Sequence, residues 1–395
     1  MRQSLFIAAA LVTGACSGRD AGPVVVRTVS DRTGVPVGGV QVQVEGQPWA
    51  TTGADGKATF AVVPRPFTVR VHQSPRSDSH SVFVLQGRTA SEVVAEVYGN
   101  PNGFSSFRQA RVSGIVAGRS GSPSARVVVS VGQREANYGT VAAADGSFDF
   151  PALWQGQAAA KVFVRAFESD GADAPGHYYG FGSASVSVVD GGETLGVPLR
   201  LEPVVEGLVA GKASLPAVLA TPRSLAAFLW LSFNRYEQFQ LQSSPVAPDN
   251  FAVVVPSVPG VEASLRIHAV GSGVQSWHQR RVAAPSSGLG FSLPAPPELL
   301  EPAAGATVGG ATVFRWSRGE PGGSSTLFLG CGWPQAGAVD YLIETQGVEA
   351  TRPEIPGIAV PTGAACRWAV FWCAAADPAV EERCAWSRER AATGL

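Results

Sequence analysis

The sequence predicts an all-β protein built from tandem β-sandwich domains. Its 395 residues include 46 glycines and 29 prolines, and such residues interrupt the chain roughly every ten positions, which is the spacing of turns between short strands. Valines alternate with other residues in many of the segments between these turns, as in strands that bury one face. A chain of this length exceeds one hydrophobic core, so we expect several domains of about 90 residues each.

The N-terminus has the features of a secretory signal. Arg2 opens a short apolar run that ends in the sequence LVTGAC, whose last residue is Cys16. A run of about ten apolar residues is too short to cross a bilayer as a permanent helix, and small residues before a cleavage point are typical of export signals. The stretch resembles a bacterial lipobox, which implies that residues 1–15 are removed and that Cys16 receives a lipid.

The residues around Cys16 also bear on location. By resemblance to known lipoproteins, an aspartate after the cysteine favours retention in the inner membrane, and Ser17 stands there instead. We therefore expect a cell-envelope lipoprotein of the outer membrane, tethered by residues 16–23 and facing either the periplasm or the outside. Thr13 departs from the leucine that is commonest at its position, so an ordinary secretory signal with an incidental cysteine is the alternative.

The charge of the chain excludes some functions. Only 15% of the residues are charged, the formal net charge is −1, and no basic run occurs, so nucleic-acid binding is not expected. No apolar run after the signal reaches membrane-spanning length. The lipid is therefore the only membrane contact that the sequence predicts.

An internal repeat gives the strongest evidence on organisation. A Gly-x-Pro motif followed by three alternating valines spans residues 34–44 and recurs about 87 residues later, over 121–131. Each copy continues with an Ala-Asp-Gly turn, at Asp55 and at Asp145, and a phenylalanine five residues past the aspartate. Asp-Gly tolerates the positive φ angles of a two-residue turn, and alternating valines bury one strand face, so each copy predicts a β-hairpin.

With Asp31, Thr51-Thr52 and Val63-Pro64, these residues resemble carboxypeptidase regulatory-like domains. Such domains are small seven-stranded sandwiches of transthyretin-like topology. They accompany peptidases, receptors and surface proteins without being the catalytic part, so the resemblance implies a structural or binding module.

The resemblance differs in extent along the chain. It is good over 24–98, fair over 110–201 and thin over 205–293, where Asp249-Asn250-Phe251 and Val255-Pro256 echo the same turn and strand. The third segment is therefore either a third copy or another type of sandwich.

Residues 294–395 have a different pattern. Pro297-Glu298-Leu299 leads to Phe314-Arg315-Trp316, and the segments that begin at Cys366 and at Trp386 have the composition of closing strands. The pattern resembles a fibronectin type III-like or Ig-like β-sandwich. Prolines in the preceding residues make a stiff linker, since proline fixes φ and excludes helix.

Four cysteines lie in this last segment: Cys331, Cys366, Cys373 and Cys384. Export places them where disulfides persist, and four cysteines allow three pairings. Cys366 and Cys373 are seven positions apart on one expected strand and point to opposite faces, so they do not pair. If the last two strands form a hairpin, Cys373 pairs with Cys384 and Cys331 with Cys366. Zinc is the poorer alternative, because close cysteine pairs and interleaved histidines are lacking.

One long polar loop mixes carboxylates, a histidine and aromatic rings. It contains Asp170, Asp173, His177, Tyr178 and Tyr179. Aromatic faces stack on sugar rings, and spaced carboxylates bind calcium through oxygen, so these residues form the candidate ligand loop. The aspartate spacing differs from the order of a calcium loop, which favours a solvated inter-strand loop with tyrosines packed at its base.

Two further aromatic groups are either core or binding surface. Residues 228–239 include a strand that is apolar on both faces, as expected between two sheets or at an interdomain contact. In the last segment, Trp368 and Trp372 share a strand face, so one is expected in the core and the other partly exposed.

The sequence lacks the motifs that are typical of catalytic and cofactor-binding sites. It lacks a Gly-x-Ser-x-Gly elbow and a His-Glu-x-x-His helix, and its five histidines are scattered without ligand spacing. We therefore expect a protein that is not an enzyme and that binds neither a cofactor nor a metal. A triad assembled from distant loops is the minority alternative.

Together these observations predict a lipid-anchored envelope protein that displays tandem β-sandwiches. The expected function is adhesion, binding or scaffolding, with a surface polysaccharide or an envelope protein as partner, since open sandwich edges accept added strands and loops supply specificity. The alternative is an accessory subunit that positions a polysaccharide or a peptide for a partner enzyme. The sequence leaves the oligomeric state open.

Overall fold

The computed structural model describes residues 21–30, 34–76, 79–97, 108–122, 125–132, 138–154, 158–171, 176–234, 237–248, 250–332, 338–355, 358–360, 362–374 and 381–394. These residues form an all-β protein, as predicted, and the one helical element among them is a short 3-10 turn, η1 (Ala217–Leu219). No helix in the described ranges is long and apolar enough to cross a membrane. The predicted signal peptide and Cys16 lie outside these ranges.

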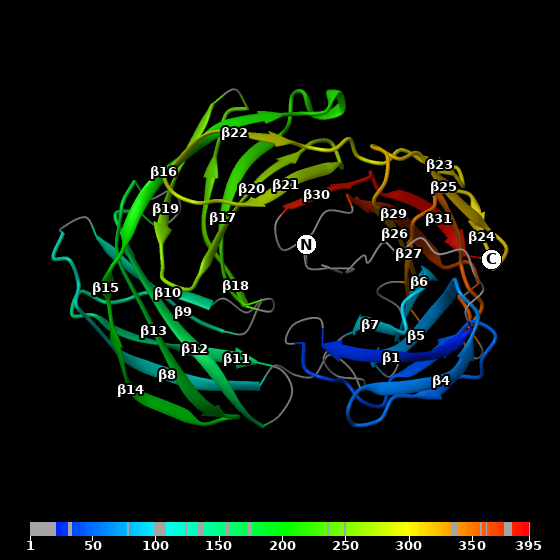
Figure 1. Ribbon diagram of the computed structural model, residues 1–395, viewed down its shortest axis with the longest axis horizontal. Coiled ribbons are helices and arrows are strands. Elements are labelled where there is room, and N and C mark those ends of the chain that lie inside the picture. Colours follow the sequence, from blue (N-terminus) through cyan, green and yellow to red (C-terminus); the bar gives the residue numbers. More distant parts are fainter. Residues whose placement is uncertain are drawn as a thin grey trace.

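The strands form four lobes, which follow one another round a ring (Figure 1). Lobe 1 comprises β1 (Gly22–Ser30), β2 (Gln41–Val44), β3 (Ala50–Thr51), β4 (Lys57–Val63), β5 (Phe67–Arg76), β6 (Ser79–Arg88) and β7 (Glu92–Val97). Lobe 2 comprises β8 (Arg108–Ala117), β9 (Arg126–Gly132), β10 (Tyr138–Val141), β11 (Ser147–Trp154), β12 (Ala159–Ser169), β13 (Tyr178–Val189), β14 (Glu193–Arg200) and β15 (Glu202–Pro203).

The other two lobes complete the ring. Lobe 3 comprises β16 (Val205–Ser214), β17 (Ser224–Asn234), β18 (Glu237–Pro245), β19 (Phe251–Ser257), β20 (Glu262–Val270), β21 (Gln275–Arg281) and β22 (Ser286–Ser292). Lobe 4 comprises β23 (Leu299–Glu301), β24 (Thr307–Val308), β25 (Val313–Trp316), β26 (Ser324–Cys331), β27 (Ala338–Thr345), β28 (Glu349–Thr351), β29 (Ala365–Cys373), β30 (Glu381–Trp386) and β31 (Arg390–Gly394).

Lobes 1, 2 and 3 share one seven-stranded topology. In each, the first strand is central in a three-stranded sheet, antiparallel to the fourth strand and parallel to the seventh: β4-β1-β7, β11-β8-β14 and β19-β16-β22. The facing sheet has the third, second, fifth and sixth strands in that order: β3-β2-β5-β6, β10-β9-β12-β13 and β18-β17-β20-β21. The segment 205–293, for which two sandwich types were open, therefore has the strand order of the first two lobes.

Lobe 4 has a different plan. Its sheet β23-β25-β28 faces a second sheet in which β26 lies between β27 and β29, and β29 also pairs with β30 and β31. Trp368 and Trp372 are both buried, with 0% and 1% of their surfaces exposed. The expectation that one of them is partly exposed was therefore wrong, because Trp368 lies in the core of the lobe and Trp372 is also covered, with its Nε1–H donating to the backbone oxygen of Gly322 at 3.0 Å.

The two Ala-Asp-Gly turns differ from the predicted hairpins. Gly56 and Gly146 do adopt positive φ angles of 72° and 86°, and a Cβ at either position would lie within 2.5 Å of a backbone oxygen. However, the strands on either side of each turn belong to different sheets: β3 and β4 in lobe 1, β10 and β11 in lobe 2. The turn therefore carries the chain from one layer of the sandwich to the other.

A continuous sheet joins three of the lobes. The sixth strand of lobe 1, β6, pairs in parallel with β27 of lobe 4, and the sixth strand of lobe 3, β21, pairs antiparallel with β30 of lobe 4. The resulting sheet runs β18-β17-β20-β21-β30-β29-β26-β27-β6-β5-β2-β3. In lobe 2 the sixth strand, β13, pairs instead with the short strand β15, at Gly180 and Phe181.

Strand β6 is buried on both faces at the junction of lobes 1 and 4. Val82 and Val84 belong to the core of lobe 4, whereas Phe83 and Leu85 belong to the core of lobe 1. Across the junction, Arg88 and Glu344 form an ion pair at 2.6 Å. The joint sheet therefore carries the two cores on opposite faces.

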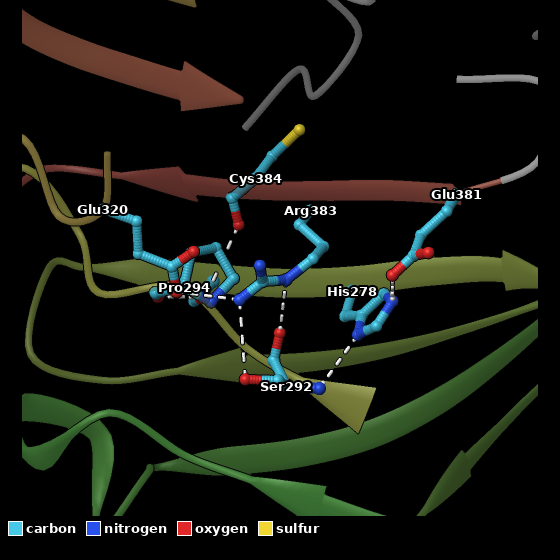
Figure 2. A network of polar contacts seen from close by, with 8 residues as sticks. His278, Ser292, Pro294, Glu320, Glu381, Arg383 and Cys384 are labelled. Carbon is cyan, nitrogen blue, oxygen red and sulfur yellow. Dashed lines mark hydrogen bonds and ion pairs between the residues drawn. The ribbon is translucent and has the colours of Figure 1, made fainter. Parts of the chain in front are cut away.

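A polar network fastens lobe 3 to lobe 4 (Figure 2). His278 lies 2.7 Å from the carboxylate of Glu381 through Nε2, while its Nδ1 accepts the backbone N–H of Ser292 at 2.9 Å. Arg383 donates to the backbone oxygen of Ser292 at 2.9 Å and to Glu320 at 2.7 Å. Because Nδ1 accepts, the ring proton of neutral His278 is on Nε2, the nitrogen beside the carboxylate of Glu381.

Lobes 2 and 3 meet through a small apolar cluster that includes Phe167, Tyr178, Leu231 and Val258. The guanidinium of Arg165 lies 3.8 Å from the ring centre of Phe233 in the neighbouring lobe, a cation–π geometry. This junction thus combines apolar burial with a charge over an aromatic face.

The two disulfides are the predicted pairs. Cys331 is directly opposite Cys366 on β26 and β29, and Cys373 is opposite Cys384 on β29 and β30, each with a Cα–Cα distance of 4.1 Å. As expected, Cys366 and Cys373 point to opposite faces of β29. The first pair lies in the core of lobe 4, whereas Cys373 is partly exposed.

We predict that a mild reductant opens Cys373–Cys384 before Cys331–Cys366, because Cys331 and Cys366 are both buried whereas Cys373 is partly exposed. Opening the 11-residue loop should lower the free energy of unfolding by about 2–3 kcal/mol. Mass-spectrometric mapping of alkylated cysteines after stepwise reduction, with urea unfolding of the partly reduced protein, checks both points. Equal rates of opening would contradict the order.

We also predict that the protein loses stability as the pH falls below about 6.5. Burial, with the nearby Arg266, lowers the pKa of His268 to about 4, and burial lowers the pKa of His278. The unfolded chain therefore takes up protons that the folded chain rejects, and each such histidine costs at most about 1.4 kcal/mol per pH unit.

Urea midpoints at pH 7.5, 6 and 5 measure this loss, and His278→Gln should flatten it. His177→Gln is the matched control, because a hydrogen bond from His177 to Glu206 raises the pKa of His177. Removing His177 should leave the loss of stability at low pH unchanged or make it steeper. If His177→Gln and His278→Gln flattened this loss equally, the loss could not be assigned to His278.

Candidate functional site: an inner aromatic face

The candidate site lies on the face of the joint sheet that is turned away from the cores of lobes 3 and 4. Alternation along each strand decides which side chains lie there: Leu229 and Ile267 enter the core of lobe 3, so Phe228 and His268 point the other way. In Figure 1, β17, β20, β21, β30, β29 and β26 lie on the inner side of the ring, and β16, β22, β23 and β25 on its outer side. The face therefore looks toward the middle of the ring.

A row of rings crosses this face from lobe 3 to lobe 4. Consecutive ring centres are 5.8, 5.7, 5.3, 5.7 and 6.5 Å apart. Trp277 is 9% exposed, and the other rings are half-buried. We call this row the inner aromatic face; its members, in order, are Phe228, His268, Trp277, Phe371, Trp386 and Phe328.

The lobe 4 end of the inner aromatic face is hollowed into a groove. Its walls combine aromatic and aliphatic side chains with hydroxyls, one carboxylate and one disulfide sulfur. The lining residues are Ser324, Thr326, Phe328, Leu342, Glu344, Phe371, Cys373 and Trp386. Apolar walls with a few polar groups are also found in ligand sites, which typically enclose a larger volume.

A buried ion pair lies beneath the lobe 3 end of the row. Arg266 and Glu382 are 3.8 Å apart, and each side chain is only 15% exposed. The guanidinium lies 5.4 Å from the ring centre of Trp230 and 5.5 Å from that of Trp277. Burial lowers the pKa of Arg266 and raises that of Glu382, while the charge of each partner opposes the shift. The guanidinium is thus paired with Glu382 and lies beside the rings of Trp230 and Trp277.

Glu382 also belongs to a cluster of three metal-ligating residue types. Its carboxylate lies 3.2 Å from the sulfur of Cys384, and Cys373 completes the cluster. Because the two sulfurs are joined to each other, they do not serve as thiolate ligands in the oxidised protein.

The predicted ligand loop lies at the junction of lobes 2 and 3. His177 contacts Glu206 of lobe 3 at 2.7 Å, and its backbone N–H donates to Asp170 at 2.9 Å. Tyr178 is buried in the apolar cluster of the junction, and Tyr179 is half-buried; Asp173 lies outside the described residues. His177 and Tyr178 thus contribute to the contact between lobes 2 and 3. The packing of the tyrosines beneath the loop agrees with the inter-strand loop that the sequence favoured.

The inner aromatic face was not predicted as a unit from the sequence. Phe228 was singled out as core or binding surface, and its strand is indeed apolar on both faces. Phe371 and Trp386 drew attention only through their segments, because pairing of β21 with β30 is what aligns them with lobe 3. One signal was available: aromatic residues recur at positions that alternate with the buried residues of their strands.

Comparison with known proteins assigns no family. No family model matches the chain, and no curated protein does. Among solved structures, the Bacillus anthracis TIE protein is 12% identical, with 69% of this chain and 50% of that chain covered and a TM-score of 0.17. The full-length major pilin SpaD from Corynebacterium diphtheriae is 9% identical, with 65% and 88% covered and a TM-score of 0.17.

A tetra-tandem repeat from the extending region of a large adhesion protein is 9% identical, with 95% and 100% covered and a TM-score of 0.16. This chain spans half the length of the TIE protein and 26% of a leucine-rich repeat protein from Bacteroides thetaiotaomicron. At such TM-scores the likenesses give no basis for assigning a function. The fold class rests on the strands and sheets described above.

Proposed function

We propose that this protein is a non-catalytic binding and scaffolding protein of the cell envelope. The observation that supports this most is the joint sheet, in which lobe 4 pairs with β6 of lobe 1 and with β21 of lobe 3. Pairing of edge strands couples the lobes through backbone hydrogen bonds, which suits a body that holds a fixed shape. A scaffold needs such a shape, whereas a flexible string of domains would not provide it.

The polar groups at the lobe junctions support the same reading. Across the junction of lobes 3 and 4, His278 contacts Glu381 and Arg383 donates to the backbone of Ser292, while Glu320 holds Arg383 from within lobe 4. A catalytic acid or base needs a reactive group that faces a substrate within hydrogen-bond reach. These side chains are instead engaged in joining the lobes.

A second candidate function is favoured by the groove on the inner aromatic face. Aromatic rings offer flat apolar surfaces that stack on the C–H faces of sugars, and hydroxyls and a carboxylate beside them accept or donate hydrogen bonds. Trp386 and Phe371 line the groove together with Ser324, Thr326 and Glu344. The protein would then hold a polysaccharide chain, either as an adhesin or for a partner enzyme.

We predict that Trp386→Ala lowers affinity for the bound polysaccharide at least about tenfold, which corresponds to about 1.4 kcal/mol. Affinity electrophoresis against a panel of cell-wall and capsular polysaccharides measures this. Leu300→Ala is the matched control, because Leu300 is 51% exposed in the same lobe and lies outside the groove. If no polysaccharide retards the wild type, or both variants lose binding equally, the groove is not the glycan site.

We also predict that the protein is anchored by lipid at Cys16 and that Cys16→Ala releases it. Labelling cells with a fatty-acid analogue, followed by membrane fractionation, should place label in the wild type and none in the variant. Proteolysis of intact cells distinguishes an outward from a periplasmic orientation. An unlabelled wild type would leave a soluble secreted scaffold, which overturns the lipid but not the binding role.

A further inference from the structure

The fold brings together two histidines that the sequence left apart. His72 on β5 and His80 on β6 are on adjacent strands of the joint sheet. Nε2 of His72 lies 3.1 Å from Nδ1 of His80, and the ring centres are 5.3 Å apart. Both side chains are half-buried, so part of each residue is exposed to solvent.

Gln41 on the neighbouring strand β2 sets the orientation of His72. Its Oε1 lies 2.8 Å from Nδ1 of His72. A carbonyl oxygen only accepts, so Nδ1 carries the proton and Nε2 presents its lone pair to His80. Metal-binding histidines are typically oriented in this way, by an acceptor on the ring nitrogen that does not bind the metal.

The nitrogen separation suits a single metal ion. Two nitrogens bound to one tetrahedral Zn²⁺ at about 2.0–2.1 Å each lie about 3.3–3.4 Å apart, close to the 3.1 Å between His72 Nε2 and His80 Nδ1. We propose that His72 and His80 together bind a divalent transition-metal ion of the zinc type through these two atoms. The hydroxyl of Ser74, 3.3 Å from Nδ1 of His80, lies beside the ion, and water completes its coordination.

The proton balance of binding follows from the two tautomers. In the metal-free protein, Nδ1 of His80 donates to Nε2 of His72, because the latter has no proton. When the ion binds, the proton of His80 moves from Nδ1 to Nε2 through solvent and the ion takes its place between the rings. No proton is released overall.

The position of this site gives it a structural effect. His80 is opposite Val339 in the β6–β27 pair that joins lobe 1 to lobe 4. An ion held by both histidines would fix β5 to β6 beside that junction. Binding to the folded protein alone should therefore raise the melting temperature as free Zn²⁺ rises.

The test is titration of the purified full-length protein with ZnCl₂ in a calorimeter, in buffers that do not chelate zinc. We expect one saturable ion per chain. His72→Gln and His80→Asn should each weaken binding at least about tenfold, Gln41→Leu about tenfold or more, and Gln41→Glu should tighten it. His177→Gln is the control and should bind as the wild type does.

Melting curves in EDTA show whether each variant folds, and the electron paramagnetic resonance of added Cu²⁺ provides a second readout. Two nitrogen ligands in the wild type and fewer in His80→Asn are expected. The proposal would be overturned if the wild type showed no saturable zinc binding. It would also be overturned if the single variants Gln41→Glu and His80→Asn both bound zinc as the wild type does.

Discussion

Backbone pairing across lobe boundaries joins lobes 1, 3 and 4, and it depends on the sixth strands of lobes 1 and 3. The outer edge of each such strand would otherwise present a row of unsatisfied N–H and C=O groups. In lobes 1 and 3 this edge pairs with lobe 4, through β27 and β30. In lobe 2 the short strand β15, which ends in Pro203, pairs with Gly180 and Phe181 at the start of the same edge, and proline limits addition there because it lacks an N–H. Lobe 4 therefore covers this edge in two of the three repeated lobes.

The same pairing creates the surface on which the proposed binding function rests. Because β21 and β30 are neighbours, Trp277 of lobe 3 lies 5.3 Å from Phe371 of lobe 4, ring centre to ring centre. The buried Arg266–Glu382 pair spans the same boundary. Burying such a pair is costly, and buried pairs are retained in some proteins because they specify one arrangement over others. Here the pair joins β20 of lobe 3 to β30 of lobe 4, beside the rings that meet across the boundary.

Much of the fold could be predicted from local pattern. The alternating valines, the Asp-Gly turns and the cysteine spacing depend on a few residues each, and they led to the all-β class and to both disulfide pairs. The same turns were wrongly interpreted as hairpins, because Asp55-Gly56 specifies a tight reversal without saying which sheet the chain enters next. Domain boundaries and the lipid at Cys16 stay predictions.

The joining of lobes could not be predicted in that way, since it depends on pairing between strands some 260 residues apart in sequence, such as β6 and β27. One residue pattern did indicate that β6 is covered on both faces. Residues 82–85 are consecutive and all buried, and a run without polar interruption is typical of a strand covered on both faces. The histidine pair was hidden for a similar reason: His72 and His80 meet only because β5 and β6 are adjacent.

The shared strand β6 also limits how such a protein changes by gene duplication. Repeated sandwiches joined end to end gain or lose copies freely, since every copy is complete in itself. Here a deleted first lobe would strip Val82 and Val84 from the core of lobe 4, and an inserted copy that lacked a strand such as β15 would leave the edge of its sixth strand unpaired. An exposed edge of that kind promotes aggregation. The number of repeated lobes is therefore expected to stay constant when such a gene evolves, because lobe 4 pairs with particular copies.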